Sequence, residues 1–138
     1  MKKYFVIVLS LLLSGLSGCA TYNLEKTIWF NISPVIENEG VKGNVVTSLY
    51  FMTDTNVDFY ASVIVDSTVI VHPYMMSRGT YSTSGKPRKE AQISITAVDM
   101  QNETVKYNGA FRKTDGMFLM SHDSIVRAYN FFPNAKLP

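Results

Sequence analysis

Apolar and polar residues alternate from Val57 to Asp66, and this alternation limits the fold more than any other feature of the sequence. Successive side chains of a β-strand point to opposite faces, so a period of two predicts a strand with one buried face. We therefore expect Phe59 and Val63 to point into a hydrophobic core. Asp58 and Ser62, on the other face, are expected to point into solvent.

Other segments of the chain also have the character of strands. The alternation returns at 92–97, with Ile93 and Ile95 on the face expected to be buried, and at 105–112, with Tyr107 on that face. Val45–Met52 and Met117–Met120 are apolar or neutral on both faces, which indicates strands that are covered on both sides or that carry an exposed patch.

Turn-forming residues separate these segments at intervals near ten, the spacing typical of sandwiches and barrels. The turns are too short for a crossover helix, so parallel βαβ units are excluded. Two stretches are longer and are expected to be loops, His72–Arg78 and Ser84–Glu90. Pro73 and Gly79 mark the first of them as a loop. With a first strand at Thr27–Asn31 and a last one at Ile125–Phe131, we expect about eight or nine strands.

A meander of this many strands closes on itself and removes its edges, whereas an immunoglobulin-like sandwich needs longer crossing connections. We therefore predict an all-β fold, a single antiparallel up-and-down barrel over residues 27–138. The sequence contains one cysteine, Cys19, so the barrel must be held together by hydrophobic burial and not by an internal disulfide. The chain is long enough for one such core.

The N-terminal residues have the three parts of a secretory signal peptide. Basic residues at Lys2-Lys3 precede an apolar run, Tyr4–Leu13, and small residues follow it. The run is shorter than the roughly 20 apolar residues that span a bilayer. The segment ends in Leu16–Cys19, whose sequence Leu-Ser-Gly-Cys resembles the lipobox of bacterial lipoproteins. The alternative is an ordinary cleavage site in which Cys19 is only a small residue.

The lipobox resemblance implies that residues 1–18 are a lipoprotein signal peptide and that Cys19 becomes the first residue, acylated with chains such as palmitate. Residues 19–26 would then be a tether between the lipid and the barrel. Each buried methylene contributes about 0.8 kcal/mol, so two or three acyl chains hold a protein on a membrane permanently. Ala20 follows the cysteine in place of aspartate, which in the enterobacterial sorting pattern implies the outer membrane.

The charge of the chain argues against nucleic acid as a partner. Residues 1–18 contain two of the 13 basic side chains and none of the 11 acidic ones, so the rest of the chain has no net formal charge. A neutral domain has little with which to neutralise a phosphate backbone. The basic cluster Lys86–Lys89 is followed at once by Glu90 and is expected to be a solvated loop.

Three further motifs point to a family. They are an early Trp29, the central segment Arg78–Gly85, and a late hairpin formed by Tyr107–Phe111 and Asp115–Leu119. Together they resemble the small lipocalin-like lipoproteins of Gram-negative envelopes, over most of the chain that follows Cys19. The resemblance implies a lipocalin-like barrel on the cell envelope.

No set of residues predicts catalysis or a metal site. His122, Asp123 and Ser124 are adjacent in a turn, where they cannot form a hydrogen-bonded relay, and His72 is a lone imidazole. Asp54–Asp58 resembles the start of a calcium loop, but Phe59 stands where that loop needs glycine. We expect no enzymatic activity and no cofactor other than the covalent lipid.

Two short sequences, at 66–68 and 123–125, resemble the Asp-Ser/Thr-apolar acceptor used for O-glycosylation in some Gram-negative lineages. Both lie in expected turns, where hydroxyls are exposed. The resemblance implies Ser67 and Ser124 as glycosylation sites.

Two functions are compatible with the sequence. In the first, the barrel binds a small apolar ligand in its interior or at its mouth, with contacts from six residues: Phe59, Tyr74, Met75, Met76, Tyr81 and Phe111. In the second, the protein is an adaptor with a solidly packed barrel that contacts another envelope protein. The apolar residues of the expected 74–78 loop serve either as a plug or as a contact surface. An interior filled with side chains would favour the adaptor.

Overall fold

The computed structural model of the chain describes residues 23–86, 90–112 and 116–133. These residues form nine β-strands and no helix that could cross a membrane. The strands are β1 (Thr27–Ile32), β2 (Ile36–Asn38), β3 (Val41–Phe51), β4 (Asn56–Val65), β5 (Thr68–Lys86), β6 (Glu90–Asp99), β7 (Thr104–Arg112), β8 (Gly116–Met120) and β9 (Val126–Phe131).

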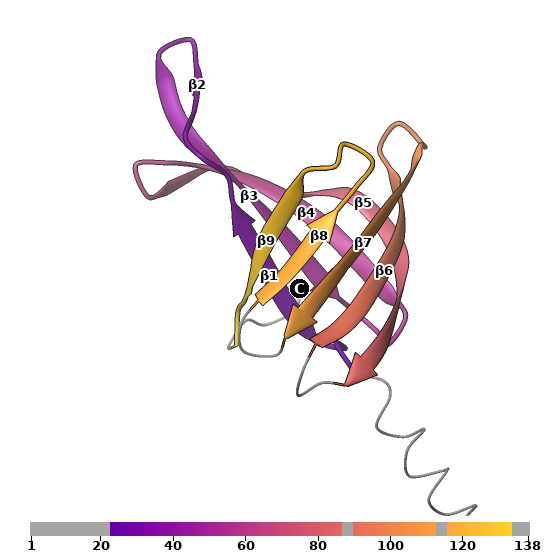
Figure 1. Cartoon of the computed structure of the whole chain (residues 1–138). Helices are drawn as coiled ribbons and strands as arrows, with labels where there is room; N and C mark the ends of the chain where they lie inside the picture. The colour runs from indigo at the N-terminus through magenta and orange to yellow at the C-terminus, as the bar shows by residue number, and fades with distance from the viewer. Residues whose placement is uncertain (1–22, 87–89, 113–115, 134–138) are drawn as a thin grey trace, which may run out of the picture.

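Eight of these strands form a closed antiparallel barrel, as Figure 1 shows. From β3 to β9 each strand pairs with the next one in the chain, and β1 pairs with both β9 and β3. The remaining strand, β2, pairs only with the start of β3 and forms a hairpin that projects beyond the barrel. The predicted all-β, up-and-down barrel of about eight strands is confirmed.

The barrel closes at a short seam between β1 and β9. Only two residue pairs join these strands, Trp29↔Phe131 and Phe30↔Asn130. The side chain of Asn31 extends the seam, because its Nδ2 donates a hydrogen bond of 2.6 Å to the carbonyl oxygen of Ala128. A side-chain amide thus continues the ladder where the backbone pairing ends.

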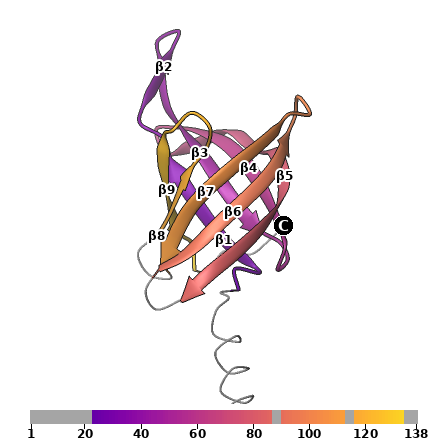
Figure 2. The ribbon, with the colours of Figure 1, turned by 45° about the vertical axis from the view of Figure 1, so that its right-hand side comes forward.

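The two ends of the barrel differ. Thr27, at the start of β1, lies at what we call the tether end, together with the turn between β3 and β4. The β2–β3 hairpin and the turns that follow β4, β6 and β8 lie at the opposite end, which we call the hairpin end (Figures 1 and 2). The β2–β3 and β4–β5 hairpins both project beyond the barrel wall there.

The core fills the barrel between these ends with side chains that alternate along the strands. β6 is the clearest case, since its burial alternates residue by residue along the strand. One cluster joins the buried inward-facing residues Trp29, Leu49, Phe51, Val57, Phe59, Tyr81, Ile93, Ile95, Phe111, Met117, Leu119 and Tyr129. Leu24, which the sequence predicts to lie in the tether, also belongs to this cluster and is fully buried.

The expected loop at His72–Arg78 is wrong, because all of its residues lie in the long strand β5. Pro73 suggested a loop, yet it lies where the β4–β5 ladder is irregular, between the pairs Ala61↔Tyr74 and Val63↔Val71. A proline is tolerated in a strand at such a bulge or at a sheet edge. The expected Ser84–Glu90 loop is also too long, since β5 extends to Lys86 and β6 begins at Glu90.

Gly79 also lies in a strand and not in the expected loop, for a different physical reason. It pairs with Val57 on β4 and Ala97 on β6, so it lies in the interior of the sheet. A Cβ atom there would meet the carbonyl oxygen of Thr96 and would lie 2.7 Å from the Cα of Ala97. Glycine is therefore required by the close approach of β6, not by a turn.

The expected wet face of β4 is wrong as well. Asp58 and Ser62 alternate with the buried Phe59 as predicted, but their exposed fractions are only 3% and 9%. β4 is therefore covered on both faces near Asp58. The cover at this point is the side chain of Arg78 on the neighbouring strand.

Candidate functional site

Three of the six residues predicted to contact a ligand are part of the packed core. Phe59 and Phe111 are each 2% exposed and Tyr81 is 7% exposed. The ring of Tyr81 packs edge-on against Phe51, with 4.8 Å between centroids, and its hydroxyl donates a 2.7 Å hydrogen bond to the carbonyl oxygen of Thr53. Burial raises the pKa of Tyr81 to about 12. These residues hold the barrel together and are not presented to an external ligand.

Two further tyrosines, Tyr107 and Tyr129, pack in or against the core, where burial and, less strongly, the charge of Arg127 act on the pKa of both. Tyr107 is half-buried and its ring stacks on Phe59, with 5.1 Å between the centroids. Burial raises the pKa of Tyr107, and it raises that of Tyr129 to about 12. Both hydroxyls are therefore neutral donors over the physiological pH range.

An ion pair between β9 and the turn before it lies near these two tyrosines. Arg127 Nη2 is 2.9 Å from Asp123 Oδ2, and Asp123 Oδ1 accepts hydrogen bonds from Ser121 Oγ and from the backbone N–H of Ile125. The bond from Arg127, followed by those from Ile125 and Ser121, holds the pKa of Asp123 well below its usual value. His122 takes no part in these bonds, so the residues 122–124 do not form a relay.

The outer wall carries a second, more buried ion pair. Arg78 on β5 donates two hydrogen bonds to Asp58 on β4, from Nε to Oδ1 at 2.9 Å and from Nη2 to Oδ2 at 3.0 Å. The Asp58 side chain is 5% exposed and that of Arg78 is 68% exposed. The guanidinium therefore forms a lid over the carboxylate and presents its other side to solvent.

Two tyrosines stand beside this ion pair on the same wall. Tyr50 pairs with Asp58 across β3 and β4, and its ring lies 4.7 Å from that of Tyr60. Met75 is opposite Tyr60 on β5. Tyrosine, methionine and arginine are the residue types enriched in protein–protein interfaces. No local pattern in the sequence predicts this cluster. Its members are spread over 28 positions, from Tyr50 to Arg78, in segments that are expected to be separate strands and a loop.

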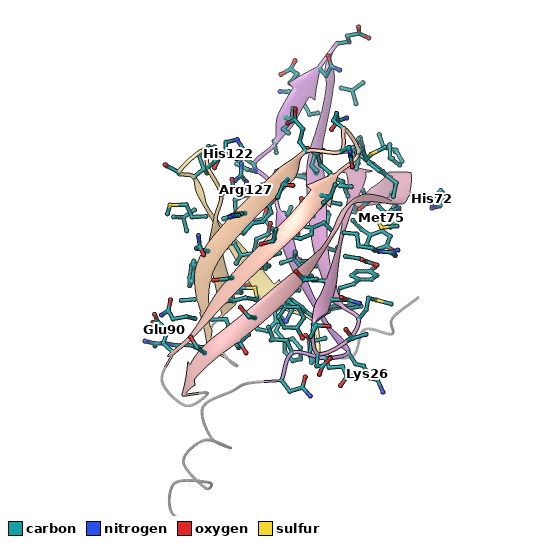
Figure 3. All side chains as sticks on the ribbon, turned by 90° about the vertical axis from the view of Figure 1, so that its right-hand side faces the viewer. Lys26, His72, Met75, Glu90, His122 and Arg127 are labelled. Atoms are coloured by element: carbon teal, nitrogen blue, oxygen red, sulfur yellow. The ribbon has the colours of Figure 1, made fainter. Side chains whose placement is uncertain are left out.

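The other three predicted contact residues, at 74–76, lie on β5 at the edge of the hairpin end. Tyr74 is 47% exposed and Met75 is 39% exposed, whereas Met76 is half-buried. Figure 3 shows Met75 and His72 on the outer side of the barrel, on the part of β5 that extends past the end of β6. Met75 is opposite Tyr60 on the outer face of the wall, whereas Tyr74 is opposite Ala61, whose side chain is buried. The exposed fractions of Tyr74 and Met75 are compatible with a contact surface at the rim of the barrel.

Exposed apolar residues continue from β5 over the two projecting hairpins. Ile36 and Val41, on β2 and β3, are 51% and 53% exposed, and Val69 and Ile70 at the start of β5 are 47% and 55% exposed. Contiguous exposed apolar patches in proteins are typical of sites that contact other proteins, membranes or ligands.

Acidic side chains border the same surface. The hairpin end contains Glu37, Glu39, Asp66, Asp99, Glu103 and Asp123. Lys42 lies 3.8 Å from Glu37, and Arg127 pairs with Asp123. In the part of the chain that the structure describes, no basic side chain forms an ion pair with the other four carboxylates. The hairpin end is therefore both apolar and acidic.

A small, open pocket lies on the wall beside β7 and β8. It has a volume of about 240 Å³ and is lined by Glu90, Ala110, Phe111, Arg112, Gly116 and Phe118. Ligand pockets in proteins have volumes of roughly 300–1,000 Å³ and are mostly enclosed. Phe118, which is 50% exposed, gives this pocket an apolar edge and belongs to the exposed face of the Met117–Met120 strand.

The remaining predictions concern the two glycosylation serines, the lack of a metal site and the lipidated cysteine. Ser67 and Ser124 are exposed residues of turns, with φ values of 62° and 59°. The described residues include no group of three or more acidic, histidine or cysteine side chains that would hold a metal ion. Cys19 lies outside the described residues.

Comparison with known proteins leaves the family open. No family model, curated protein or solved structure matches this chain.

Proposed function

We propose that this protein is a noncatalytic lipoprotein of the bacterial cell envelope, anchored through acylated Cys19, which acts as an adaptor through protein contacts at its hairpin end. The observation that carries the proposal is the packed interior. Phe59, Tyr81, Phe111 and Leu119 are all buried in one cluster, and the exposed apolar residues lie outside it. Of the two functions compatible with the sequence, the packed interior favours the adaptor.

The way in which the chain enters the barrel supports this arrangement. Leu24 is buried, the N–H of Lys26 donates to the carbonyl oxygen of Phe51, and the N–H of Thr27 donates to that of Leu24. These contacts fix the chain from Leu24 onward at the tether end. Only residues 19–23 then remain as a tether, and they reach about 17 Å when fully extended. An acylated Cys19 therefore keeps the tether end close to the membrane.

The hairpin end faces away from the membrane in this arrangement, because it is at the opposite end of the barrel. Its exposed apolar residues are then presented to other envelope proteins and not to lipid. The acidic side chains there also disfavour contact with an anionic membrane surface. With Ala20 after the lipidated cysteine, the outer membrane is the proposed location.

The proposal is tested by mass spectrometry of the protein purified from its own membrane. We expect a mass that corresponds to a chain beginning at Cys19 and carrying two or three acyl chains, with no small molecule bound in stoichiometric amount. The variant Cys19→Ser should leave the membrane fraction or remain unprocessed. Normal processing and membrane attachment of this variant would contradict the anchor, and a stoichiometric apolar ligand would contradict the adaptor function.

A further inference from the structure

The first part of β5, Thr68–Met76, has one edge with no strand partner among the described residues. β4 pairs with its other edge, while β6 reaches only to Asp99, which pairs with Ser77. β5 therefore extends past the end of β6, as the position of His72 in Figure 3 shows. Unpaired backbone groups along such a free edge form a template for an added strand.

The side chains along this free edge are uncharged and mostly apolar, which favours pairing with another strand. Val69, Ile70 and Tyr74 are about half exposed, and no residue from Ser67 to Ser77 carries a formal charge at neutral pH with His72 neutral. Proteins usually protect an edge with lysine or another charge. Along this edge Pro73 is the one residue that disfavours pairing, because it has no backbone N–H to donate. It divides the edge into Thr68–His72 and Tyr74–Met76.

Carboxylates lie at both ends of the free edge. Asp66 is in the turn that leads into β5, and Asp99 pairs with Ser77 at the other end. The Asp99 carboxylate is fixed there, because its Oδ1 accepts hydrogen bonds from the backbone N–H groups of Gln101 and Glu103, at 3.0 Å and 2.9 Å. Glu103, in the same turn, is exposed.

This distribution of charge argues against a second copy of the chain as the added strand. Two copies that pair antiparallel along Thr68–Met76 would bring Asp66 of each close to Asp99 and Glu103 of the other. Arg78, the cation at that end of the edge, already donates two hydrogen bonds to Asp58. Like charges in such positions destabilise the contact at both ends. The complementary strand has basic side chains at its two ends and apolar residues between them.

We propose that the free edge of β5 binds an extended segment of a partner protein by strand addition, and that this segment is apolar in its middle and has a lysine or arginine at each end. The inference rests on the proposed adaptor function and specifies the chemistry of the partner. Backbone hydrogen bonds to β5 provide the attachment. Contacts with Val69, Ile70 and the flanking carboxylates provide the selectivity.

The first test uses the full acylated protein in detergent. The probe is a synthetic peptide with blocked ends, Arg-Thr-Val-Thr-Val-Thr-Val-Thr-Arg. We expect measurable binding by calorimetry that weakens as salt is added. The same peptide with glutamate at both ends, or with methyl groups on alternate backbone nitrogens, should not bind. Equal binding of the N-methylated peptide, or no binding of the arginine peptide, would overturn the proposal.

The second test places a charge on the edge. Ile70→Lys should weaken binding of the arginine peptide by about tenfold or more, because a lysine both repels the probe and disrupts pairing at an edge. Val41→Lys is the matched control, since Val41 is equally exposed on the neighbouring hairpin, at 53% against 55%. Melting curves must show both variants folded. Equal loss of binding in both variants would overturn the proposal.

Failure of strand addition is distinct from failure of the adaptor function. If the probe does not bind, while a photo-crosslinker at Ile36 in the envelope still reacts with a protein, the adaptor function stands and the strand proposal is wrong. Dimers of the wild-type chain in sedimentation that disappear with Ile70→Lys would show that the edge pairs with a second copy, which also overturns the proposal.

Discussion

The guanidinium of Arg78 covers the buried carboxylate of Asp58 through two hydrogen bonds of 2.9 Å and 3.0 Å. The pair connects β4 to β5 directly after the free edge Thr68–Met76, where β5 gains its second neighbour, β6. The hydrogen bonds to Asp58 raise the pKa of Arg78, so the cation is retained at every physiological pH. We interpret the pair as the contact that holds β5 against β4 next to the free edge.

This pair gives a prediction for stability. Arg78→Met should lower the melting temperature clearly, because it leaves the Asp58 carboxylate buried without its counter-charge. The double variant Asp58→Asn with Arg78→Met should be more stable than Arg78→Met alone, since an amide is cheaper to bury than an unpaired charge. Lys42→Met, which breaks the exposed 3.8 Å pair with Glu37, is the control and should have little effect. A double variant as unstable as Arg78→Met would contradict this account.

The packed interior gives a second prediction, tested with one substitution at two sites. Phe59→Ala should cost about 3–5 kcal/mol of unfolding free energy, because the side chain is buried in the core. Phe118→Ala removes the same atoms from a position that is 50% exposed and should cost much less. Chemical denaturation measures both. Similar losses would show that the assignment of inner and outer faces is wrong.

The close approach of β6 to Gly79 gives a third prediction, which concerns stability. Gly79→Ala should destabilise the barrel strongly, since the added Cβ collides with the backbone of Thr96 and Ala97, which cannot rotate away. At Gly40, with φ of 81° and no atom within 4 Å of an added Cβ, Gly40→Ala should cost only about 1–2 kcal/mol of backbone strain. If thermal melting gives the two variants the same stability, β5 does not lie as close to β6 as described.

The pH dependence of stability is a fourth prediction. The folded-state pKa of Asp123 is lowered by Arg127 and the turn, so its contribution to stability is fully present above its unfolded pKa of about 3.9 and is lost as the pH falls through the folded pKa. Wild-type protein should therefore exceed Asp123→Asn in melting temperature above about pH 5, with a difference that shrinks in acid. A difference that stays constant down to pH 2 would contradict the ion pair with Arg127.

The sequence predicts the barrel because alternation reports directly on which residues are buried. In β6 and β7 the predicted inner residues Ile93, Ile95 and Tyr107 are those that the structure places in or against the core. The prediction fails where one residue has two physical explanations. Pro73 and Gly79 are both typical of loops, but a bulge accounts for the first and close strand packing for the second.

The candidate site was harder to predict than the fold. Tyr74 and Met75 are predicted to lie in a loop that serves as a plug or as a contact surface; the structure has them partly exposed on a strand. The buried Asp58 was predicted to face water, because a polar residue in an alternating strand gives no sign that a partner 20 positions away will cover it. The free edge of β5 depends on where β6 ends, and no local pattern reports that.

Site-specific photo-crosslinking in the intact envelope tests the central claim, contact with a partner at the hairpin end, most directly. Crosslinkers at Ile36 and at Ile70 should give a discrete protein adduct that is lost in the Cys19→Ser background, whereas one at Phe118 on the opposite wall should give none. Adducts from Phe118 alone, or no adduct from either hairpin position in the anchored protein, would contradict the account.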